Sequence, residues 1–203
     1  MSIPSKFSSA VLDFIEGKID THHKHIIDLG CGKGNFYFES VERGLDMYYS
    51  GIDANEKAIN EFKEKIIALE RQSGLSLNVS VFPVDLESDE MLPPANADIS
   101  VCTLVLHHIE DHSSLMDKVL SSSIVRKESY LVFSDLMPEE GLFHPESIPV
   151  AHKGVDPDIF AQLLEKKGLT VVDRTVFEGF MRKSPVDDVE REYNQWAIIA
   201  KRE

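Results

Sequence analysis

Short apolar runs alternate with helix-like segments along this chain, and this alternation constrains the fold more than any other feature. Buried parallel strands are continuous apolar runs, whereas amphipathic helices carry apolar residues three and four positions apart. The runs that predict strands are His25–Leu29, Met47–Ile52, Leu77–Val84, Ala97–Val105, Tyr130–Ser134, Leu169–Phe177 and Asn194–Ala200. The segments that predict helices are Ser5–Lys18, Asn35–Arg43, Asn55–Arg71, Ser113–Val125 and Pro157–Lys167.

This order predicts an α/β fold: a doubly wound, Rossmann-like sheet of seven strands with helices on both faces. The strand–helix alternation makes the sheet mostly parallel. The last two strands have no helix pattern between them, which predicts a C-terminal antiparallel hairpin. Because no linker, repeat or low-complexity segment interrupts the pattern, we expect residues 1–203 to form a single domain. In such sheets the ligand binds beyond the carboxyl ends of the strands, at the switch point after the first strand.

The net charge and the hydropathy of the chain limit the binding partners and the cellular compartment that we expect for the protein. The formal net charge of -14 repels the phosphates of nucleic acids and of anionic lipids, so a nucleic-acid partner is not expected. No apolar run reaches the roughly 20 residues that cross a bilayer, and Met1–Asp20 has no secretory leader pattern, so we expect a cytoplasmic protein. Cys31 and Cys102 lack metal-site and redox spacing and are interpreted as packing residues.

The first predicted strand runs into a turn with three glycines at alternate positions, Asp28-Leu29-Gly30-Cys31-Gly32-Lys33-Gly34. Glycines allow a sharp turn and a close approach of the backbone to a ligand. A dinucleotide fingerprint would need its third glycine where Asn35 stands, and a phosphate loop would need Ser or Thr where Gly34 stands. Asp28 would repel a pyrophosphate but suits a ligand that carries positive charge.

With Asp28, this turn resembles the first motif of the class I S-adenosylmethionine-dependent methyltransferases. The resemblance continues in order at Gly51–Ala54, Val84–Leu86 and Asp98–Ile109, and its last segment is most similar to the small-molecule branch. It implies S-adenosyl-L-methionine as cofactor and S-adenosyl-L-homocysteine as product. By the family pattern, Asp53 holds the ribose hydroxyls and Asp85 the adenine amine. The implied cofactor-binding residues are Asp28, Gly30, Cys31, Gly32, Gly34, Asp53, Ala54, Asp85, Leu86, Thr103, Leu104 and His107.

Methyl transfer from a sulfonium depends mainly on proximity and orientation, and a base helps when the acceptor is a hydroxyl. The candidate catalytic residues follow the fourth or fifth predicted strand, on the side of the ligand crevice: His108, Asp135, His144 and His152. The stretch Met137–Val155 is long for a connection and predicts a lid or acceptor-recognition loop. The segment Glu178–Tyr193 is a second region that could contact an acceptor, through Phe180, Met181, Arg182 or Lys183, although a solvated hairpin connection is the preferred interpretation.

No metal is expected. His108 and His112 have the spacing of one helix face and could form a ligand pair, but Asp111 is placed as the cap of the following helix. An acidic partner just upstream of this pair is missing from the sequence.

Three functions stay open: a methyltransferase for small molecules, one for protein or RNA, and a non-catalytic cofactor-binding subunit of the same fold. The small size, the acidic balance and the pair His107-His108 favour the first. Thr103–Leu106 lacks the Pro-Pro of enzymes that methylate amino groups of bases or glutamine. The sequence does not specify the acceptor, the methylated atom or the oligomeric state.

Overall fold

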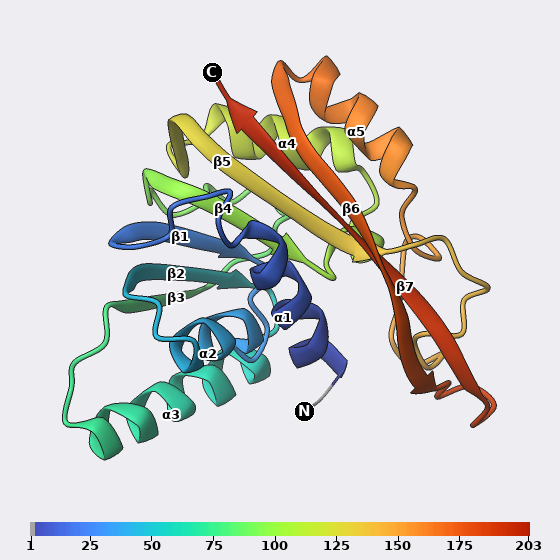
Figure 1. The fold of residues 1–203 in the computed structure, drawn as a ribbon, viewed down its shortest axis with the longest axis horizontal. Helices are drawn as coiled ribbons and strands as arrows, with labels where there is room; N and C mark the ends of the chain where they lie inside the picture. Colours follow the sequence, from blue (N-terminus) through green and yellow to red (C-terminus); the bar gives the residue numbers. More distant parts are fainter. Residues whose placement is uncertain (1–2) are drawn as a thin grey trace.

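One seven-stranded sheet, in the order β3-β2-β1-β4-β5-β7-β6, organises the computed structural model, which describes residues 3–203 (Figure 1). Strands β1 to β5 pair in parallel, and β7 is antiparallel to both β5 and β6. The predicted doubly wound sheet with a C-terminal antiparallel hairpin is therefore confirmed. The strands are β1 (Lys24–Leu29), β2 (Met47–Asp53), β3 (Val79–Pro83), β4 (Ala97–Thr103), β5 (Val125–Leu136), β6 (Leu169–Lys183) and β7 (Glu190–Arg202).

Helices cover both faces of this sheet (Figure 1). They are α1 (Ile3–Ile15), α2 (Asn35–Glu42), α3 (Glu56–Ser73), α4 (His112–Ser121) and α5 (Pro157–Lys166), with a short 3₁₀ turn η1 (Leu106–His108). One buried cluster joins α1, α2 and α3 to the sheet, and another joins α4 and α5 to its opposite face. Ile26 and Ile27, neighbours in β1, belong to different clusters, because successive strand residues point to opposite faces.

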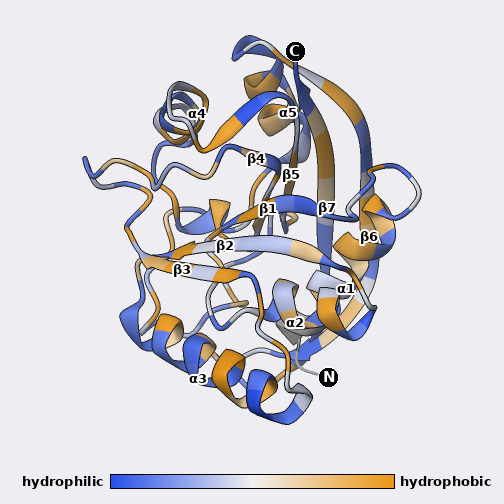
Figure 2. Ribbon diagram, turned by 90° about the vertical axis from the view of Figure 1, so that its left-hand side faces the viewer, coloured by the Kyte–Doolittle hydropathy of each residue, from blue (hydrophilic) through white to orange (hydrophobic). Residues whose placement is uncertain are grey.

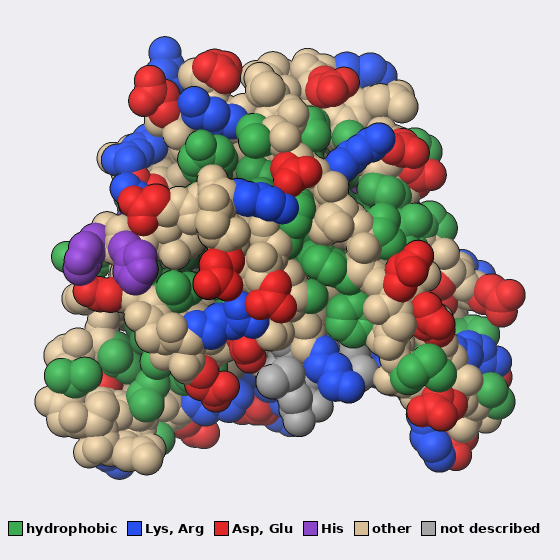
Figure 3. Space-filling model, viewed as in Figure 1, with side chains coloured by type: hydrophobic (Ala, Val, Ile, Leu, Met, Phe, Trp, Pro, Cys, Tyr) green, Lys and Arg blue, Asp and Glu red, His purple; other side chains and the backbone are tan. Residues whose placement is uncertain are grey.

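The helices are amphipathic in the way that their sequences predict. Figure 2 shows hydrophobic and hydrophilic residues alternating along α3, whose buried residues are Ala58, Ile59 and Phe62. The view in Figure 3 shows acidic and basic side chains interspersed over the surface. Cys31 and Cys102 are buried free thiols, in agreement with a packing role. Among the described residues, no helix has the length and apolar character needed to cross a membrane.

Two predicted boundaries are wrong. Val125 begins β5 instead of ending the preceding helix, because α4 ends at Ser121 and Val125 pairs with Ala97 of β4. The region Glu178–Tyr193 was expected to be a connection, but most of it forms the ends of β6 and β7, which pair as far as Lys183 with Glu190. This outer half of the hairpin is largely exposed and rich in charge, so it lacks the apolar run that marks a buried strand.

Candidate active site

A cavity of about 500 Å³ lies at the carboxyl ends of the central strands. Its residues come from α1, from the turn after β1, from the segment after β4, from the loop after β5 and from the hairpin. They are Ser8, Asp28, Gly30, Cys31, Gly32, Asn35, Phe36, Thr103, Leu104, His107, Phe143, His144, Pro145, Ile148 and Arg182. Because β4 lies between β1 and β5 in the sheet, the segment after β4 lies between the glycine turn and the loop after β5.

The three glycines of the turn after β1 serve different purposes, although all have positive φ. A Cβ on Gly30 would lie 2.2 Å from Cγ2 of Val105, and one on Gly34 would lie 2.4 Å from the Phe62 ring, so packing excludes side chains there. A Cβ on Gly32 would have only Asp53 Oδ2 nearby, at 4.0 Å. Since Gly32 lines the cavity, the space that its missing side chain leaves belongs to the ligand site.

Asp53, the last residue of β2, stabilises the glycine turn through a hydrogen bond. Its Oδ2 accepts a hydrogen bond from the Gly32 backbone N–H at 2.7 Å, and its Oδ1 accepts from the Asn55 backbone N–H at 2.8 Å. The carboxylate therefore stands beside the cavity wall at the place where the sequence predicts a ribose-binding residue.

We expect Asp53→Ala to weaken the binding of S-adenosylhomocysteine by about 1–3 kcal/mol, because a charge-assisted acceptor is lost and the Gly32 N–H is freed. Calorimetric titration measures this change. Asp53→Asn is the matched control: it keeps an amide oxygen for one backbone N–H and should lose less affinity. Equal affinity of the folded Ala variant and the wild type would contradict the ribose role.

Asp28 brings a buried acidic group to the same end of the cavity. Its side chain is 3% exposed, and the Tyr49 hydroxyl donates to its Oδ2 at 2.5 Å. Burial raises the pKa of Asp28 from 3.8 to about 7; the Tyr49 hydrogen bond acts against this rise, and the charge of Asp53 adds to it. Among the described residues, no Lys or Arg forms an ion pair with Asp28. A cationic ligand group would supply the missing partner.

Asp28→Asn should stabilise the ligand-free protein at pH 8 and weaken its ligand binding. A raised pKa means that the folded chain binds more protons than the unfolded chain between pH 3.8 and about 7, so its stability falls as the pH rises through this window. The substitution removes a destabilisation of up to about 4 kcal/mol above pH 7, and this difference vanishes below pH 4. Thermal unfolding at pH 4 and pH 8 measures it, and equal melting temperatures at pH 8 would contradict the ionised, buried carboxylate.

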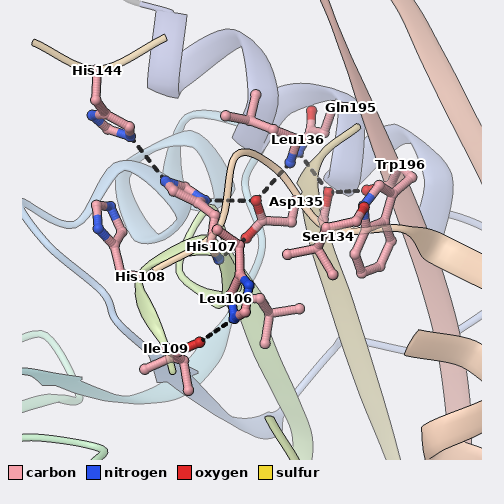
Figure 4. A network of polar contacts seen from close by, with 12 residues as sticks. Leu106, His107, His108, Ile109, Ser134, Asp135, Leu136, His144, Gln195 and Trp196 are labelled. Carbon is pink, nitrogen blue, oxygen red and sulfur yellow. Dashed lines mark hydrogen bonds and ion pairs between the residues drawn. The ribbon is translucent and has the colours of Figure 1, made fainter. Parts of the chain in front are cut away.

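A buried histidine–aspartate pair lies at the other end of the cavity (Figure 4). Nδ1 of His107 lies 2.6 Å from Oδ1 of Asp135, and both side chains are almost fully buried. Nε2 of His107 lies 2.9 Å from Nε2 of His144. A carboxylate can only accept, so we assign the His107 proton to Nδ1, which makes His144 the donor between the two rings.

The neighbouring imidazoles are neutral at physiological pH. Burial, together with the nearby rings of His107 and His108, lowers the pKa of His144 to about 4. The pKa of His108 is also lowered, first by burial and then by His107. Neutral imidazoles keep lone pairs available for a proton or for a metal ion.

Two residues of the segment after β4 carry unusual features where they line the cavity. The hydroxyl oxygen of Thr103 is buried and has no hydrogen-bond partner among the described residues. Leu104 has φ 59, a left-handed conformation that a leucine rarely adopts, and its N–H donates to the Ser134 carbonyl at 2.9 Å. Backbone strain of this kind is concentrated at functional sites.

The remaining cofactor candidates do not line this cavity. Ala54 and Asp85 are exposed, and Oδ1 of Asp85 accepts from the Glu87 backbone N–H at 2.9 Å in a local turn. Leu86 is buried in the hydrophobic core that includes α4. Asp85 follows the end of β3 at the same sheet edge as Asp53, so its adenine role stays a prediction.

The other histidines have structural contacts. Nε2 of His152 lies 2.9 Å from the Ile109 carbonyl, and its backbone N–H donates to the His107 carbonyl, which holds the loop after β5 against η1. Nε2 of His112 lies 2.7 Å from the Leu106 carbonyl. The considered pairing of His108 with His112 on one helix face is wrong, because His108 belongs to η1 and α4 begins at His112. Asp111 caps α4 as predicted.

Sequence reasoning missed part of the acceptor end. Asn35 and Phe36 directly follow the glycine turn, so their position was a usable signal. Ser8 comes from α1, whose place over the cavity no local pattern indicates. Arg182, by contrast, was one of the four hairpin residues named from the sequence as possible acceptor contacts. It reaches the cavity because β6 continues past Phe177, and its guanidinium carbon stands 4.3 Å from the centre of the Phe143 ring.

The model of the family described as "Methyltransferase domain" matches residues 20–173. All the residues that line the cavity lie within this range except Ser8 and Arg182. The chain belongs to this methyltransferase-domain family. The predicted resemblance to class I methyltransferases is thereby confirmed.

Two curated relatives are ubiquinone biosynthesis O-methyltransferases. The one from Azoarcus sp. is 29% identical over 103 residues, 51% of this chain and 41% of the relative. The one from Neisseria meningitidis serogroup C is 24% identical over 173 residues, 80% of this chain and 70% of the relative. The chain thus spans less than half of the first relative.

Solved structures agree on the fold. A SAM-dependent methyltransferase from Methanosarcina mazei has a TM-score of 0.70 at 18% identity, over 93% of this chain and 96% of that one. The magnesium protoporphyrin IX methyltransferase from Synechocystis PCC 6803, solved with bound SAM (S-adenosylmethionine), has a TM-score of 0.68 at 16% identity, over 99% of this chain and 80% of that one. The cofactor of that neighbour is the one predicted here.

Proposed function

We propose that this protein transfers the methyl group of S-adenosylmethionine to an oxygen atom of a small, anionic acceptor. The observation that carries the proposal is a single cavity with two chemically different ends. The glycine turn with Asp28 forms one end, where Asp53 lies behind the wall and accepts from the Gly32 N–H, and His144 and Arg182 belong to the other end. A cavity of about 500 Å³ has the size of a small-molecule site.

The residues at the first end fit the cofactor. Asp28 offers a buried carboxylate to its ammonium group, and Asp53 offers oxygens to its ribose hydroxyls. Gly32 leaves room against the backbone, and the buried Thr103 hydroxyl has a free hydrogen-bonding capacity. When bound, S-adenosylmethionine supplies an electrophilic methyl group whose leaving group is a neutral thioether.

The residues at the second end fit an acceptor with an apolar body and an anionic group. Phe143, which contacts both His144 and Arg182, and Ile148 provide an apolar wall. Arg182, stacked on Phe143, is the only Lys or Arg among the cavity-lining residues, and the described residues include no ion-pair partner for it. In a chain with a net charge of -14, this cation gives the cavity a local preference for anions.

The histidine cluster supports methylation of a hydroxyl. A proton released by the acceptor can pass to His144 and from it to His107, and the buried Asp135 carboxylate stabilises the resulting cation. The names of the two curated relatives also favour oxygen. The catalytic roles of His108 and His152 stay predictions. The cytoplasmic location, the single-domain organisation and the lack of a nucleic-acid partner also stay predictions.

Transfer of a labelled methyl group to a matched set of phenols tests this function. We expect dihydroxybenzoate to be methylated more efficiently than catechol, and Arg182→Gln to raise the KM for the carboxylate by roughly tenfold to 100-fold through loss of a charge-assisted contact. The KM for catechol should change little. Lys183→Gln is the control, because Lys183 is exposed and paired with Asp188. Equal effects of Arg182→Gln on both acceptors would contradict an anionic acceptor.

A further inference from the structure

We propose that His107, His108 and His144 form a binding site for a divalent transition-metal ion, with Zn²⁺ as the best match. The inference differs from the sequence-based expectation of no metal. Its use in catalysis rests on the proposed function, because the site faces the acceptor end of the same cavity.

The three rings converge. One ring nitrogen from each of the three histidines lies within 4.8 Å of the others, and the two Nε2 atoms of His107 and His144 are 2.9 Å apart. The ring centroids are separated by 4.2 to 5.0 Å. Tetrahedral zinc with nitrogens at about 2.1 Å needs nitrogens about 3.4 Å apart, so small ring rotations complete the site.

Hydrogen bonds to Nδ1 of His107 and His108 leave the Nε2 atoms of these two rings available to bind a metal ion. Nδ1 of His107 is held by the Asp135 carboxylate, and Nδ1 of His108 is 3.0 Å from the Pro149 carbonyl, to which it donates. The Nε2 atoms of His107 and His108 then keep their lone pairs, and His144, which donates from Nε2 in the metal-free protein, offers a lone pair there in its other tautomer. Metal-binding histidines are oriented in this way, with the second ring nitrogen donating to a carboxylate or a backbone carbonyl. His112 and His152 use Nε2 on backbone carbonyls and take no part.

The composition of the set selects the kind of ion. Three imidazoles and no direct carboxylate suit zinc, copper, nickel or iron and do not suit Mg²⁺ or Ca²⁺. Three protein ligands leave a fourth position open, as in catalytic zinc sites. Because His107 and His144 line the cavity together with Arg182, this position faces the acceptor. In the metal-bound form the ion would hold the acceptor oxygen and would replace the two histidines as the group that acts on the hydroxyl.

Titration of the metal-free protein with Co²⁺, followed by visible absorption and repeated with Zn²⁺ in a calorimeter, tests the site. The wild type and the control His22→Ala, which changes an exposed histidine, should each bind one ion. His144→Ala and His108→Ala should lower the affinity at least tenfold. His144 and His108 are partly exposed, so these variants avoid the buried His107 and should fold.

Binding that is absent, non-stoichiometric or unchanged in both histidine variants would overturn the metal site. Titration of the same samples with S-adenosylhomocysteine separates the two proposals. If that ligand binds and the metal does not, the metal site is wrong and the methyltransferase proposal stands. If the metal binds and that ligand does not, the proposed function is wrong and the metal site stands.

Discussion

Gly32→Val should abolish the binding of S-adenosylhomocysteine while leaving the chain folded. The new side chain would project into space that the protein itself leaves empty, since the nearest protein atom to an added Cβ is 4.0 Å away. We expect an affinity loss of at least about 100-fold, or roughly 2.7 kcal/mol. The left-handed backbone at φ 52 also adds strain of about 1–3 kcal/mol to the folded state. Calorimetric titration and thermal unfolding measure the two effects separately.

Gly44→Val is the matched control for this substitution. Gly44 has φ 75 and no atom within 4 Å of an added Cβ, and it does not line the cavity. It should therefore show the same strain with normal ligand affinity. If both variants bind ligand alike, the glycine turn is not the cofactor site.

Asp135→Asn should reduce the rate of methyl transfer about 100-fold with little change in the affinity for S-adenosylhomocysteine. Asp135 accepts from Nδ1 of His107, from the His107 backbone N–H and from the Leu136 backbone N–H. Asparagine has a single acceptor oxygen, so the His107 ring loses its fixed orientation and the negative charge beside it. Losses of 10-fold to 100-fold are typical when the residue that orients a functional histidine is changed.

A fall in kcat without a fall in ligand affinity distinguishes a positioning role of Asp135 from a general loss of structure. Ser134→Ala, in the same strand, removes a buried hydroxyl that donates to the Trp196 carbonyl, and it should lower stability without lowering kcat. A kcat of Asp135→Asn that equals the wild-type value, or one that falls only in step with ligand affinity, would exclude this role for Asp135.

Local patterns were sufficient to predict the fold and the position of Asp28 and the glycine turn at the carboxyl ends of the strands. Short apolar runs such as Ile26–Leu29, interrupted only by Asp28, identify buried strands, and the glycine turn directly follows the first of them. Because each carboxylate stands at the end of its own strand, the order of Asp28 and Asp53 along the chain also predicts their place at one sheet edge. This geometry follows from parallel pairing alone.

The acceptor end could not be predicted in the same way, because its contacts join residues far apart in sequence. Asp135 and His107 are 28 residues apart, and His107 and His144 are 37 apart. The cofactor role that family resemblance gives to His107 stays a prediction, and no local pattern indicated that its ring lies between Asp135 and His144. Arg182 lies on a charged, exposed strand whose sequence is indistinguishable from that of a solvated loop.

Calorimetric titration of the purified protein with S-adenosylhomocysteine, with NADH as the control ligand, tests the central claim most directly. The account predicts stoichiometric binding of S-adenosylhomocysteine, no binding of NADH, and loss of the signal in Gly32→Val but not in Gly44→Val. Binding of NADH, or failure of the folded wild type to bind S-adenosylhomocysteine, would contradict the assignment of the cavity to this cofactor.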